Sequence, residues 1–404
     1  MANVSSSNGL EKRPKLRFPG FDEPWKPIAF GDLVHEYSDR TKEEDEDTLL
    51  SAAIEGMFLN TELFGHQRGA SNKGYKKIKY GTMVLSTQNL HLGNANVNQR
   101  FEHGMVSPAY KTYDITGCSV DLIAQWIKSD AAKRFFYNAT TVGASVCRRN
   151  VEWDTLYEQS LYLPCRDEQE KVAKFLGLLS NRINKQQQFV SALKKYKRGV
   201  MQRIFRNMSV VSPSGFETVK LSAIFKKVSR RNNKSEIKNV ITNSAEYGLI
   251  PQRDFFDKDI AVDGNTSNYY VIEQGDFVYN PRKSNTAPYG PFNRYEREER
   301  GIISPLYTCL VLQADIEPNY LAWYFKSDAW YRYIYDNGSQ GVRHDRVSMT
   351  DDLLMGIPVI VPSKDAQIRI ANILDGLEKL LNAEISHYER LKTIREALLQ
   401  QLFI

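Results

Sequence analysis

The sequence predicts a mixed α/β (α+β) protein built from two tandem domains, each followed by a long helix. Two observations carry this prediction. Short motifs recur in the same order through both halves of the 404-residue chain, which indicates internal duplication. Each half also ends in a stretch of about forty residues without proline, whose apolar residues recur at alternating steps of four and three, as in a coiled coil.

The duplication is clearest where the two proline-free stretches begin. Leu163-Pro-Cys-Arg-Asp-Glu-Gln169 corresponds to Val361-Pro-Ser-Lys-Asp-Ala-Gln367 at an offset of 198 residues. Val106-Ser-Pro-Ala-Tyr110 corresponds to Ile303-Ser-Pro-Leu-Tyr307 at an offset of 197, and the match weakens toward the start of each half. Conserved ends and divergent bodies are expected when the ends share an architectural role and the bodies adapt to different ligands.

The repeat also sets the expected boundaries. We expect a disordered N-terminal tail over residues 1–16, a first body over 17–163 and a first helix over 164–206. A second body over 207–361 and a second helix over 362–404 follow. Each helical stretch opens with a proline followed by an acidic first turn, Asp167-Glu168 or Asp365, which suits a helix N-terminus. Such a helix would be roughly 60 Å long and needs a partner along its length.

The apolar repeat predicts that the two helices are each other's partner, in an antiparallel coiled coil with pseudo-two-fold symmetry. The expected seam residues are Leu176, Leu179, Ile183, Val190, Leu193, Lys197, Leu377, Leu381, Glu384, Leu391, Leu398 and Leu402. A register with a residue-number sum of 581 would place Lys197 beside Glu384 and Gln186 beside Arg395. We hypothesise that these two polar layers fix the register.

Positive charge is concentrated on the first helix. Residues 166–206 contain 11 Lys and Arg against 3 Asp and Glu, whereas residues 364–404 contain six of each. The whole chain has a formal net charge of +6. The basic helix would suit either phosphate groups or an acidic partner surface, and the sequence does not choose between them.

Both bodies are expected to combine short strands with one helical stretch. Gly81–Leu85 and Asp276–Tyr279 are candidate strands. The helical stretches, Val120–Tyr137 and Tyr320–Tyr335, are rich in aromatic residues, which we expect to pack in the core. The acidic run at residues 43–47 is expected to be a solvated loop that faces away from any phosphate.

Basic and amide-rich runs in the two bodies are the candidates for nucleic-acid contact. Arg reads guanine and Asn or Gln reads adenine through paired hydrogen bonds, while Lys mostly meets phosphate. Each run taken singly is more typical of an ordinary surface loop. The candidates are Lys73, Lys76, Lys77, Asn96, Asn98, Arg100, Arg230, Arg231, Asn233, Arg282, Lys283, Asn285, Gln340, Arg343 and His344.

Motifs of catalysis and metal binding are missing from the sequence. It contains no GxGxxG, GxxxxGKS/T or HExxH motif. Asn280-Pro-Arg-Lys283 begins like the Asn-Pro-Pro-Tyr motif of amino-methyltransferases, but Arg and Lys replace the residues that would wall a flipped base. The four cysteines are widely spaced, so we expect reduced thiols and no metal site. No apolar run reaches membrane-spanning length, and we expect a cytoplasmic protein without membrane partners.

These features together resemble one family. Pro14-Lys-Leu-Arg-Phe-Pro-Gly-Phe21 followed by Trp25 resembles the start of the specificity (S) subunits of type I restriction-modification enzymes. The tandem Leu-Pro and Val-Pro openings of the two helices resemble that family's conserved regions, and the resemblance covers essentially the whole chain. It implies two target-recognition domains held apart by an antiparallel coiled coil.

The resemblance also implies a non-catalytic subunit of a bacterial complex. Its implied partners are double-stranded DNA, two modification subunits that bind S-adenosylmethionine and methylate adenine, and restriction subunits with translocase and nuclease activity. No cofactor is expected on this chain itself. Two alternatives stay open from the residues alone: a self-contained DNA methyltransferase or nuclease, and a coiled-coil scaffold that binds only protein.

Overall fold

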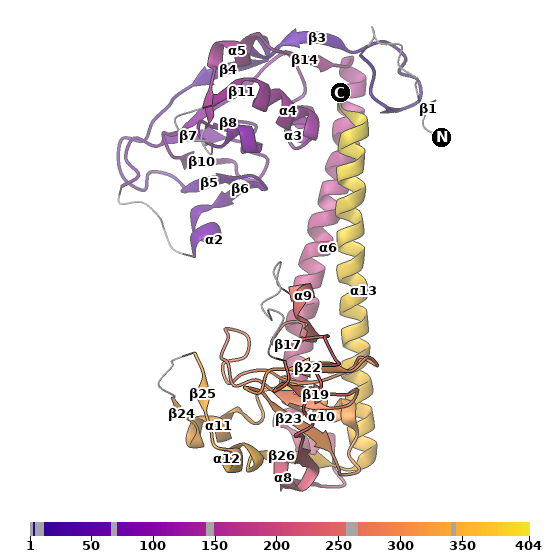
Figure 1. The fold of residues 1–404 in the computed structure, drawn as a ribbon. Helices are drawn as coiled ribbons and strands as arrows, with labels where there is room; N and C mark the ends of the chain where they lie inside the picture. The colour runs from indigo at the N-terminus through magenta and orange to yellow at the C-terminus, as the bar shows by residue number, and fades with distance from the viewer. Residues whose placement is uncertain (1–2, 5–11, 66–70, 143–148, 256–265, 341–344) are drawn as a thin grey trace. The chain divides into compact units, whose positions relative to one another are not determined.

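The computed structural model describes the chain apart from residues 1–2, 5–11, 66–70, 143–148, 256–265 and 341–344 (Figure 1). The chain divides into two compact units. Unit 1 comprises residues 1–188 and 385–404, and unit 2 comprises residues 189–384. Each unit therefore contains one body and a part of both long helices.

Two helices of the predicted length are present. Helix α6 spans Arg166–Arg206 and helix α13 spans Lys364–Leu402. In unit 1 the start of α6 packs with the end of α13, and in unit 2 the end of α6 packs with the start of α13, so the pairing is antiparallel in each unit. All twelve predicted seam residues are buried or half-buried. Within the described ranges, no helix is both long and apolar enough to cross a bilayer.

The first body is built from short antiparallel sheets around two packed helices. Its four-stranded sheet has the order β4 (Val34–Tyr37), β11 (Tyr110–Ile115), β8 (Met83–Ser86), β9 (Ala95–Val97). Two-stranded pairs are β3 (Lys26–Ala29) with β14 (Ser160–Leu163), β5 (Leu50–Ala53) with β6 (Gly56–Leu59), β7 (Lys76–Lys79) with β10 (His103–Val106), and β12 (Thr140–Val142) with β13 (Arg149–Val151). The helical elements are α1 (Phe30–Leu33), α2 (Asn60–Phe64), η1 (Leu90–Leu92), α3 (Val120–Trp126), α4 (Asp130–Asn138) and α5 (Trp153–Glu158).

The second body has the same plan. Its four-stranded sheet has the order β16 (Phe225–Lys227), β23 (Thr308–Leu312), β20 (Phe277–Tyr279), β21 (Phe292–Arg294). Its pairs are β15 (Phe216–Lys220) with β26 (Pro358–Pro362), β17 (Ile241–Ser244) with β18 (Gly248–Pro251), β19 (Tyr270–Ile272) with β22 (Gly301–Ile303), and β24 (Ser339–Gln340) with β25 (Val347–Ser348). The helices are α7 (Met208–Val211), α8 (Leu221–Ile224), α9 (Gln252–Phe255), α10 (Pro318–Lys326), α11 (Tyr331–Asn337) and α12 (Asp351–Met355).

The two bodies correspond strand for strand, which confirms the duplication inferred from the sequence motifs. In the first body Val84 of β8 pairs with Asn96 of β9, and in the second body Val278 of β20 pairs with Asn293 of β21. The small sheet pairs also recur in the same order along the chain. The fold is thus one body-plus-helix unit used twice.

Each predicted helical stretch is two helices rather than one. In the first body the break falls at Ser129, whose side-chain oxygen accepts a hydrogen bond from the Ala132 backbone N–H and caps α4. A serine cap stabilises a helix start and so favours a break in the preceding segment. The aromatic residues pack in the core as predicted, since Trp126 and Phe136 are buried in the first body and Phe325 is buried in the second.

The N-terminal tail expected to be disordered lies largely outside the described residues. Strand β1 (Asn3–Val4) pairs with β2 (Leu16–Arg17). Residues 12–15 connect to this pair, and the backbone oxygen of Lys12 accepts a hydrogen bond from the Trp25 N–H at 3.0 Å. This backbone bond closes the N-terminal segment on itself, and the Pro14–Trp25 motif packs into unit 1 through side chains such as Trp25 and Phe18.

Candidate nucleic-acid interface

A buried glutamine at the start of each long helix couples that helix to its body. The Gln169 side chain accepts a hydrogen bond from the Ser119 N–H at the start of α3 (2.8 Å) and donates to the Pro164 carbonyl (2.9 Å). In unit 2, Gln367 makes the equivalent bonds to the Glu317 N–H and the Pro362 carbonyl, both at 2.8 Å. The repeated motif thus has a structural role, because it fixes the start of α3 on α6 in unit 1 and the start of α10 on α13 in unit 2.

The polar residues of the coiled-coil seam have different partners from those predicted. Lys197 forms an ion pair with Glu378 of α13, rather than with Glu384. Arg395 donates to Ser180 Oγ at 3.0 Å, rather than to Gln186. Both observed contacts have a residue-number sum of 575, so the predicted sum of 581 is wrong by six residues, or roughly 9 Å of helix rise.

The physical reason is that the bodies take part in these polar contacts. Arg395 also donates to the Gln125 side chain of α3 (3.0 Å), and the Lys197 ammonium lies over the Trp323 ring of α10 at 5.6 Å. The apolar pattern describes only the two long helices, so it cannot predict polar contacts in which a helix of a body, α3 or α10, also takes part.

Three of the candidate DNA-contacting residues in the first body are buried and hold the body together. The Lys76 ammonium donates to the Tyr110 carbonyl (2.8 Å), and burial lowers the pKa of Lys76. The Asn98 amide donates to the carbonyls of Lys79 (3.0 Å) and Phe101 (2.8 Å). These side chains are therefore not presented on the surface in this conformation.

Asn96 has the same structural role, and its counterpart in the second body shows why. The Asn96 amide donates to the Ala53 carbonyl at 2.9 Å, which joins β9 to β5. Asn293 donates to the Ser244 carbonyl at 3.1 Å, which joins β21 to β17 in the same way. A contact that both divergent bodies keep belongs to their common scaffold rather than to the recognition of different ligands.

The remaining first-body candidates are exposed or half-exposed, and two of them are paired with acidic residues. Lys77 forms an ion pair with Glu46, and this hydrogen bond raises the pKa of Lys77. Arg100 bonds Glu62 through two nitrogens at 2.9 and 2.7 Å, while Lys73 is exposed in the turn before β7. The acidic run at 43–47 therefore lies beside Lys77, and its carboxylates neutralise part of this basic surface.

In the second body, Arg230 and Arg231 lie side by side in the chain but face different groups. Arg230 forms an ion pair with buried Asp276, whose pKa burial raises. Arg231 donates to the Asn268 carbonyl at 2.9 Å and lies over the Tyr270 ring at 5.0 Å. Both arginines are exposed, as is Asn233.

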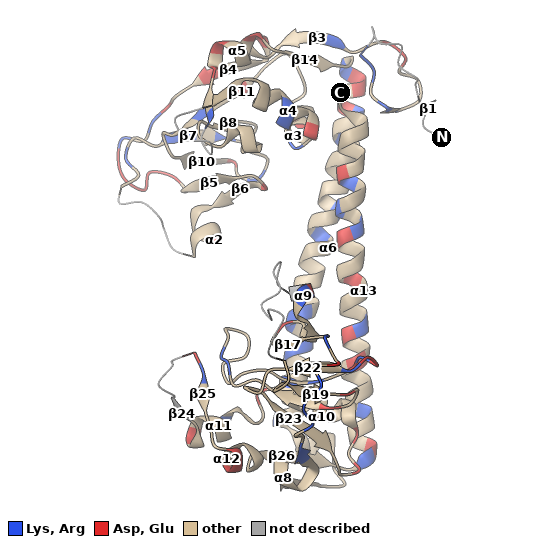
Figure 2. Ribbon diagram, in the orientation of Figure 1, with Lys and Arg blue, Asp and Glu red and all other residues tan. Residues whose placement is uncertain are grey.

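Another basic segment of the second body follows β20. Arg282 is exposed and lies 3.6 Å from an Asp345 oxygen, Asn285 is exposed, and Lys283 is half-exposed. The candidates Arg343 and His344, and the side chain of Gln340, lie outside the described residues. Figure 2 shows lysine and arginine on loops of both bodies and repeatedly along α6.

One exposed arginine was missed by the sequence reasoning. Arg40 makes an isolated bridge to Lys76, as Arg231 does to Tyr270, and each arginine donates to a backbone carbonyl of the loop that precedes the paired strand. Arg40 is therefore the first-body equivalent of Arg231. A lone arginine outside any basic run gives no signal in a sequence, and only the strand pairing reveals the equivalence.

The described residues contain no group of three or more His, Cys, Asp or Glu side chains placed to hold a metal ion. Cys118 and Cys309 are buried free thiols, and burial raises their pKa to about 11 and about 12, respectively. Cys165 is exposed just before α6, and Cys147 lies outside the described residues.

No family model and no curated protein matches this sequence. Solved structures do match its fold over nearly the whole length. A chain from a study of complex assembly and conformational transition of the type I R-M system is 16% identical, with a TM-score of 0.57 and coverage of 95% of this chain and 98% of that one. The type I restriction-modification S subunit from M. genitalium is 15% identical, with a TM-score of 0.53 and coverage of 97% and 99%.

The HsdS subunit from Thermoanaerobacter tengcongensis is also 15% identical, with a TM-score of 0.50 and coverage of 97% of this chain and 98% of that one. This chain has the S-subunit fold. The match extends through both bodies and both long helices, so it includes the repeat and not a single shared domain. The fold that the sequence resemblance implied is thereby confirmed.

Proposed function

We propose that this chain is the DNA-specificity subunit of a bacterial type I restriction-modification complex and acts in the cytoplasm without catalysing a reaction. It would recognise a bipartite target in double-stranded DNA. Two modification subunits carrying S-adenosylmethionine would methylate adenine at that target, and restriction subunits would cleave unmethylated DNA. The observation that carries this proposal is the S-subunit fold over 95–97% of the chain.

The duplicated construction supports a two-part target. Each body has its own exposed cations and its own fastening to a long helix, through Gln169 in unit 1 and Gln367 in unit 2. Two equivalent readers suit two half-sites in inverted orientation, with roughly one helical turn, about 10 bp, between their centres. The base pairs between the half-sites would be free in sequence apart from their deformability.

The exposed cations are the proposed phosphate-contacting groups. Arg100, Arg230 and Lys77 each bond a carboxylate in the free chain. The pairs of Arg100 and Lys77 are surface pairs, which are weak, at about 0–1 kcal/mol, so phosphate can replace their carboxylate partners at little cost. The partner of Arg230, Asp276, is buried. Arg231 and its equivalent Arg40 bond only backbone carbonyls through the contacts described above, and they are the strongest candidates for direct phosphate contact.

The decisive experiment reconstitutes the complex with its modification subunits and maps methylated adenines on a genomic substrate. The expected result is one bipartite motif, lost when this chain is omitted. Arg231→Ala should weaken DNA binding similarly across sequences and reduce the salt slope by about one. Arg332→Ala is the matched control, since Arg332 is exposed and pairs with Asp336 on its own helix.

Lengthening the helices tests whether their length sets the spacing between the two half-sites. A seven-residue seam-compatible insertion after Gln188 in α6, with a second after Glu384 in α13, falls at the limits of both units and leaves the contacts within each unit intact. Each insertion adds roughly 10 Å of helix, or about 3 bp of B-DNA. The half-sites should stay the same while the spacer lengthens. An unchanged spacer in a folded, active variant would contradict the idea that helix length sets the spacing between the half-sites.

Two other functions make different predictions. A self-contained methyltransferase or nuclease would act on DNA when the purified chain is given S-adenosylmethionine or Mg²⁺, and we expect no such activity. A scaffold that binds only protein would leave the reconstituted complex able to methylate, but without sequence selectivity that depends on this chain.

Exchange of the second body for that of another S subunit should change one half-site only.

A further inference from the structure

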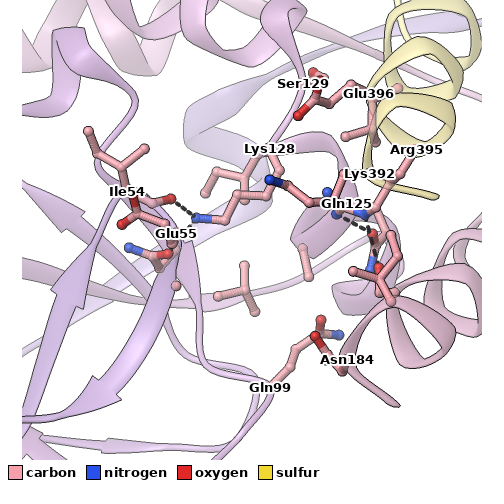
Figure 3. A pocket seen from close by; sticks show the side chains of 18 of the residues that line it. Ile54, Glu55, Gln99, Gln125, Lys128, Ser129, Asn184, Lys392, Arg395 and Glu396 are labelled. Carbon is pink, nitrogen blue, oxygen red and sulfur yellow. Dashed lines mark hydrogen bonds between the residues drawn. The ribbon is translucent and has the colours of Figure 1, made fainter. Parts of the chain in front are cut away.

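A polar cleft in unit 1 contains an arginine with only neutral hydrogen-bond partners. Arg395 of α13 donates to Ser180 of α6 and to Gln125 of α3, both at 3.0 Å. These residues line a cleft of about 1010 Å³ between the first body and the two long helices of the same unit. Figure 3 shows Arg395 and Lys392 near Gln125 in this cleft, and Asn184 beside Gln99.

A second cation in the cleft is also surrounded by neutral groups. The Lys128 ammonium donates to the carbonyls of Ile54 (2.8 Å) and Ala95 (3.1 Å), and burial lowers the pKa of Lys128 to about 8. Burial also lowers the pKa of Arg395. The carboxylates whose fields reach these cations are Glu396 and Glu55, which are exposed, and neither is hydrogen-bonded to Arg395 or Lys128 in the described structure.

The equivalent place in unit 2 has a different charge balance. At the 198-residue offset, Lys197 corresponds to Arg395 and Lys326 corresponds to Lys128. There the chain supplies its own acid, because Glu378 forms an ion pair with Lys197. A second carboxylate, Asp375, lies close by and accepts a hydrogen bond from the Trp323 indole at 2.8 Å.

Unit 1 lacks both acids at the corresponding positions. Ser180 stands where unit 2 has Glu378, and Gly177 stands where unit 2 has Asp375. Unit 1 therefore keeps a cation, Arg395, at the position of Lys197, but it has neither carboxylate. A partly buried guanidinium without a carboxylate is a strong binding group for one, since charge-assisted hydrogen bonds are roughly twice as strong as neutral ones.

We propose that the unit 1 cleft binds a carboxylate at Arg395, supplied by an acidic side chain of a partner protein. The bound group takes the place that Glu378 occupies for Lys197 in unit 2. The volume supports a polypeptide segment as its source, since clefts of about 300–1,000 Å³ enclose ligands much larger than a single ion. The third guanidinium nitrogen of Arg395, Nη1, bonds neither Ser180 nor Gln125 and is available to the incoming carboxylate.

The test compares thermal unfolding of the full-length chain in sodium acetate and in sodium chloride at equal ionic strength. Acetate should raise the Tm of the wild-type chain by about 2 °C relative to chloride. Ser180→Glu supplies the carboxylate within the chain and should abolish this difference. Asn181→Glu is the matched control, because it adds the same charge one residue away on the exposed side of α6 and should keep the acetate response.

Two further variants keep the test decisive if Ser180→Glu does not fold. Glu378→Ser should create a second acetate response by opening the equivalent place in unit 2. Arg395→Met should lose the response of unit 1. Equal acetate shifts in the wild type, Ser180→Glu and Arg395→Met would show a general salt effect and overturn the proposal.

A peptide arm identifies the source of the carboxylate. Acetylated hexaglutamate should bind the wild-type chain at least about tenfold more tightly than it binds Ser180→Glu, and acetylated hexaglutamine should bind neither. Acetate protection without tighter hexaglutamate binding would mean a small-ion site and would reject a protein segment as the occupant. The assay uses no DNA and no other subunit, so its failure leaves the proposed specificity function untouched.

Discussion

The ion pair between Arg17 and Glu168 is the contact whose loss should most weaken unit 1. Arg17 of β2 bonds Glu168 in the first turn of α6 through two nitrogens, at 2.8 and 2.7 Å. The arginine side chain is 9% exposed and the glutamate side chain 1% exposed. The hydrogen bond to Glu168 is the main cause that raises the pKa of Arg17.

Replacing only the arginine leaves a carboxylate buried without its cation. Breaking a buried pair from one side typically costs about 3–5 kcal/mol. We therefore expect Arg17→Met to lower the free energy of unfolding of unit 1 by about that amount. The double variant Arg17→Met/Glu168→Met should recover most of the loss, because it removes both buried charges. The Arg17 Nη1 atom is already buried without a hydrogen-bond partner in the described structure, which further lowers the net value of the pair.

The chain offers a matched control on the same helix. Arg166 and Glu170 form an exposed i,i+4 pair at 3.0 Å, with side chains 61% and 63% exposed, so Arg166→Met should cost no more than about 0.5 kcal/mol. Urea unfolding followed by fluorescence and by circular dichroism measures the three variants and resolves any separate transitions of the two units. A loss for Arg17→Met no larger than that for Arg166→Met would refute the reasoning.

Three further results follow from other contacts. Gln169→Ala should destabilise unit 1 by about 2–4 kcal/mol in urea unfolding, because it leaves a buried N–H and a carbonyl unpaired. Between pH 8 and 10.5 the unfolded chain binds more protons than the folded one at Lys128, whose folded pKa is about 8, so stability should rise with pH on the order of 2 kcal/mol, and Lys128→Met should remove that rise. Iodoacetamide labelling followed by peptide mass spectrometry should modify exposed Cys165 in the native chain, but Cys118 and Cys309 only after unfolding.

The long helices could be predicted from the sequence because their pattern is local and repeats many times. Every seam residue named from the apolar period is at least half-buried, including Leu176 and Leu381. The register was wrong because it paired Lys197 with Glu384 and Arg395 with Gln186, whereas these cations bond Glu378 and Ser180. The Lys197 ammonium is held by Glu378 and by the Trp323 ring together. Trp323 belongs to the second body, and the apolar pattern of the two helices carries no information about where that body packs.

The candidate interface was harder to predict because an amide or a lysine reads the same in a sequence whether it faces solvent or a carbonyl. Asn96 and Lys76 stand in polar runs that suggest a surface loop, yet both are buried and bond backbone carbonyls. Comparison of the two bodies separates these cases. A buried polar contact found in both, such as those of Asn96 and Asn293, belongs to the scaffold, and an exposed polar residue found in one is the better candidate for base recognition.

The same comparison changes what the duplication means for the helices. Conserved ends and divergent bodies would suggest that α6 and α13 are equivalent in every functional respect. The Gln169 and Gln367 contacts support that view, since they match bond for bond. The polar contacts of the coiled coil do not support it. Glu378 neutralises Lys197 in unit 2, whereas in unit 1 the corresponding position is Ser180, and Arg395 has only neutral hydrogen-bond partners. Adaptation therefore extends from the bodies into the coiled coil, and it does so where each coiled-coil cation meets its body.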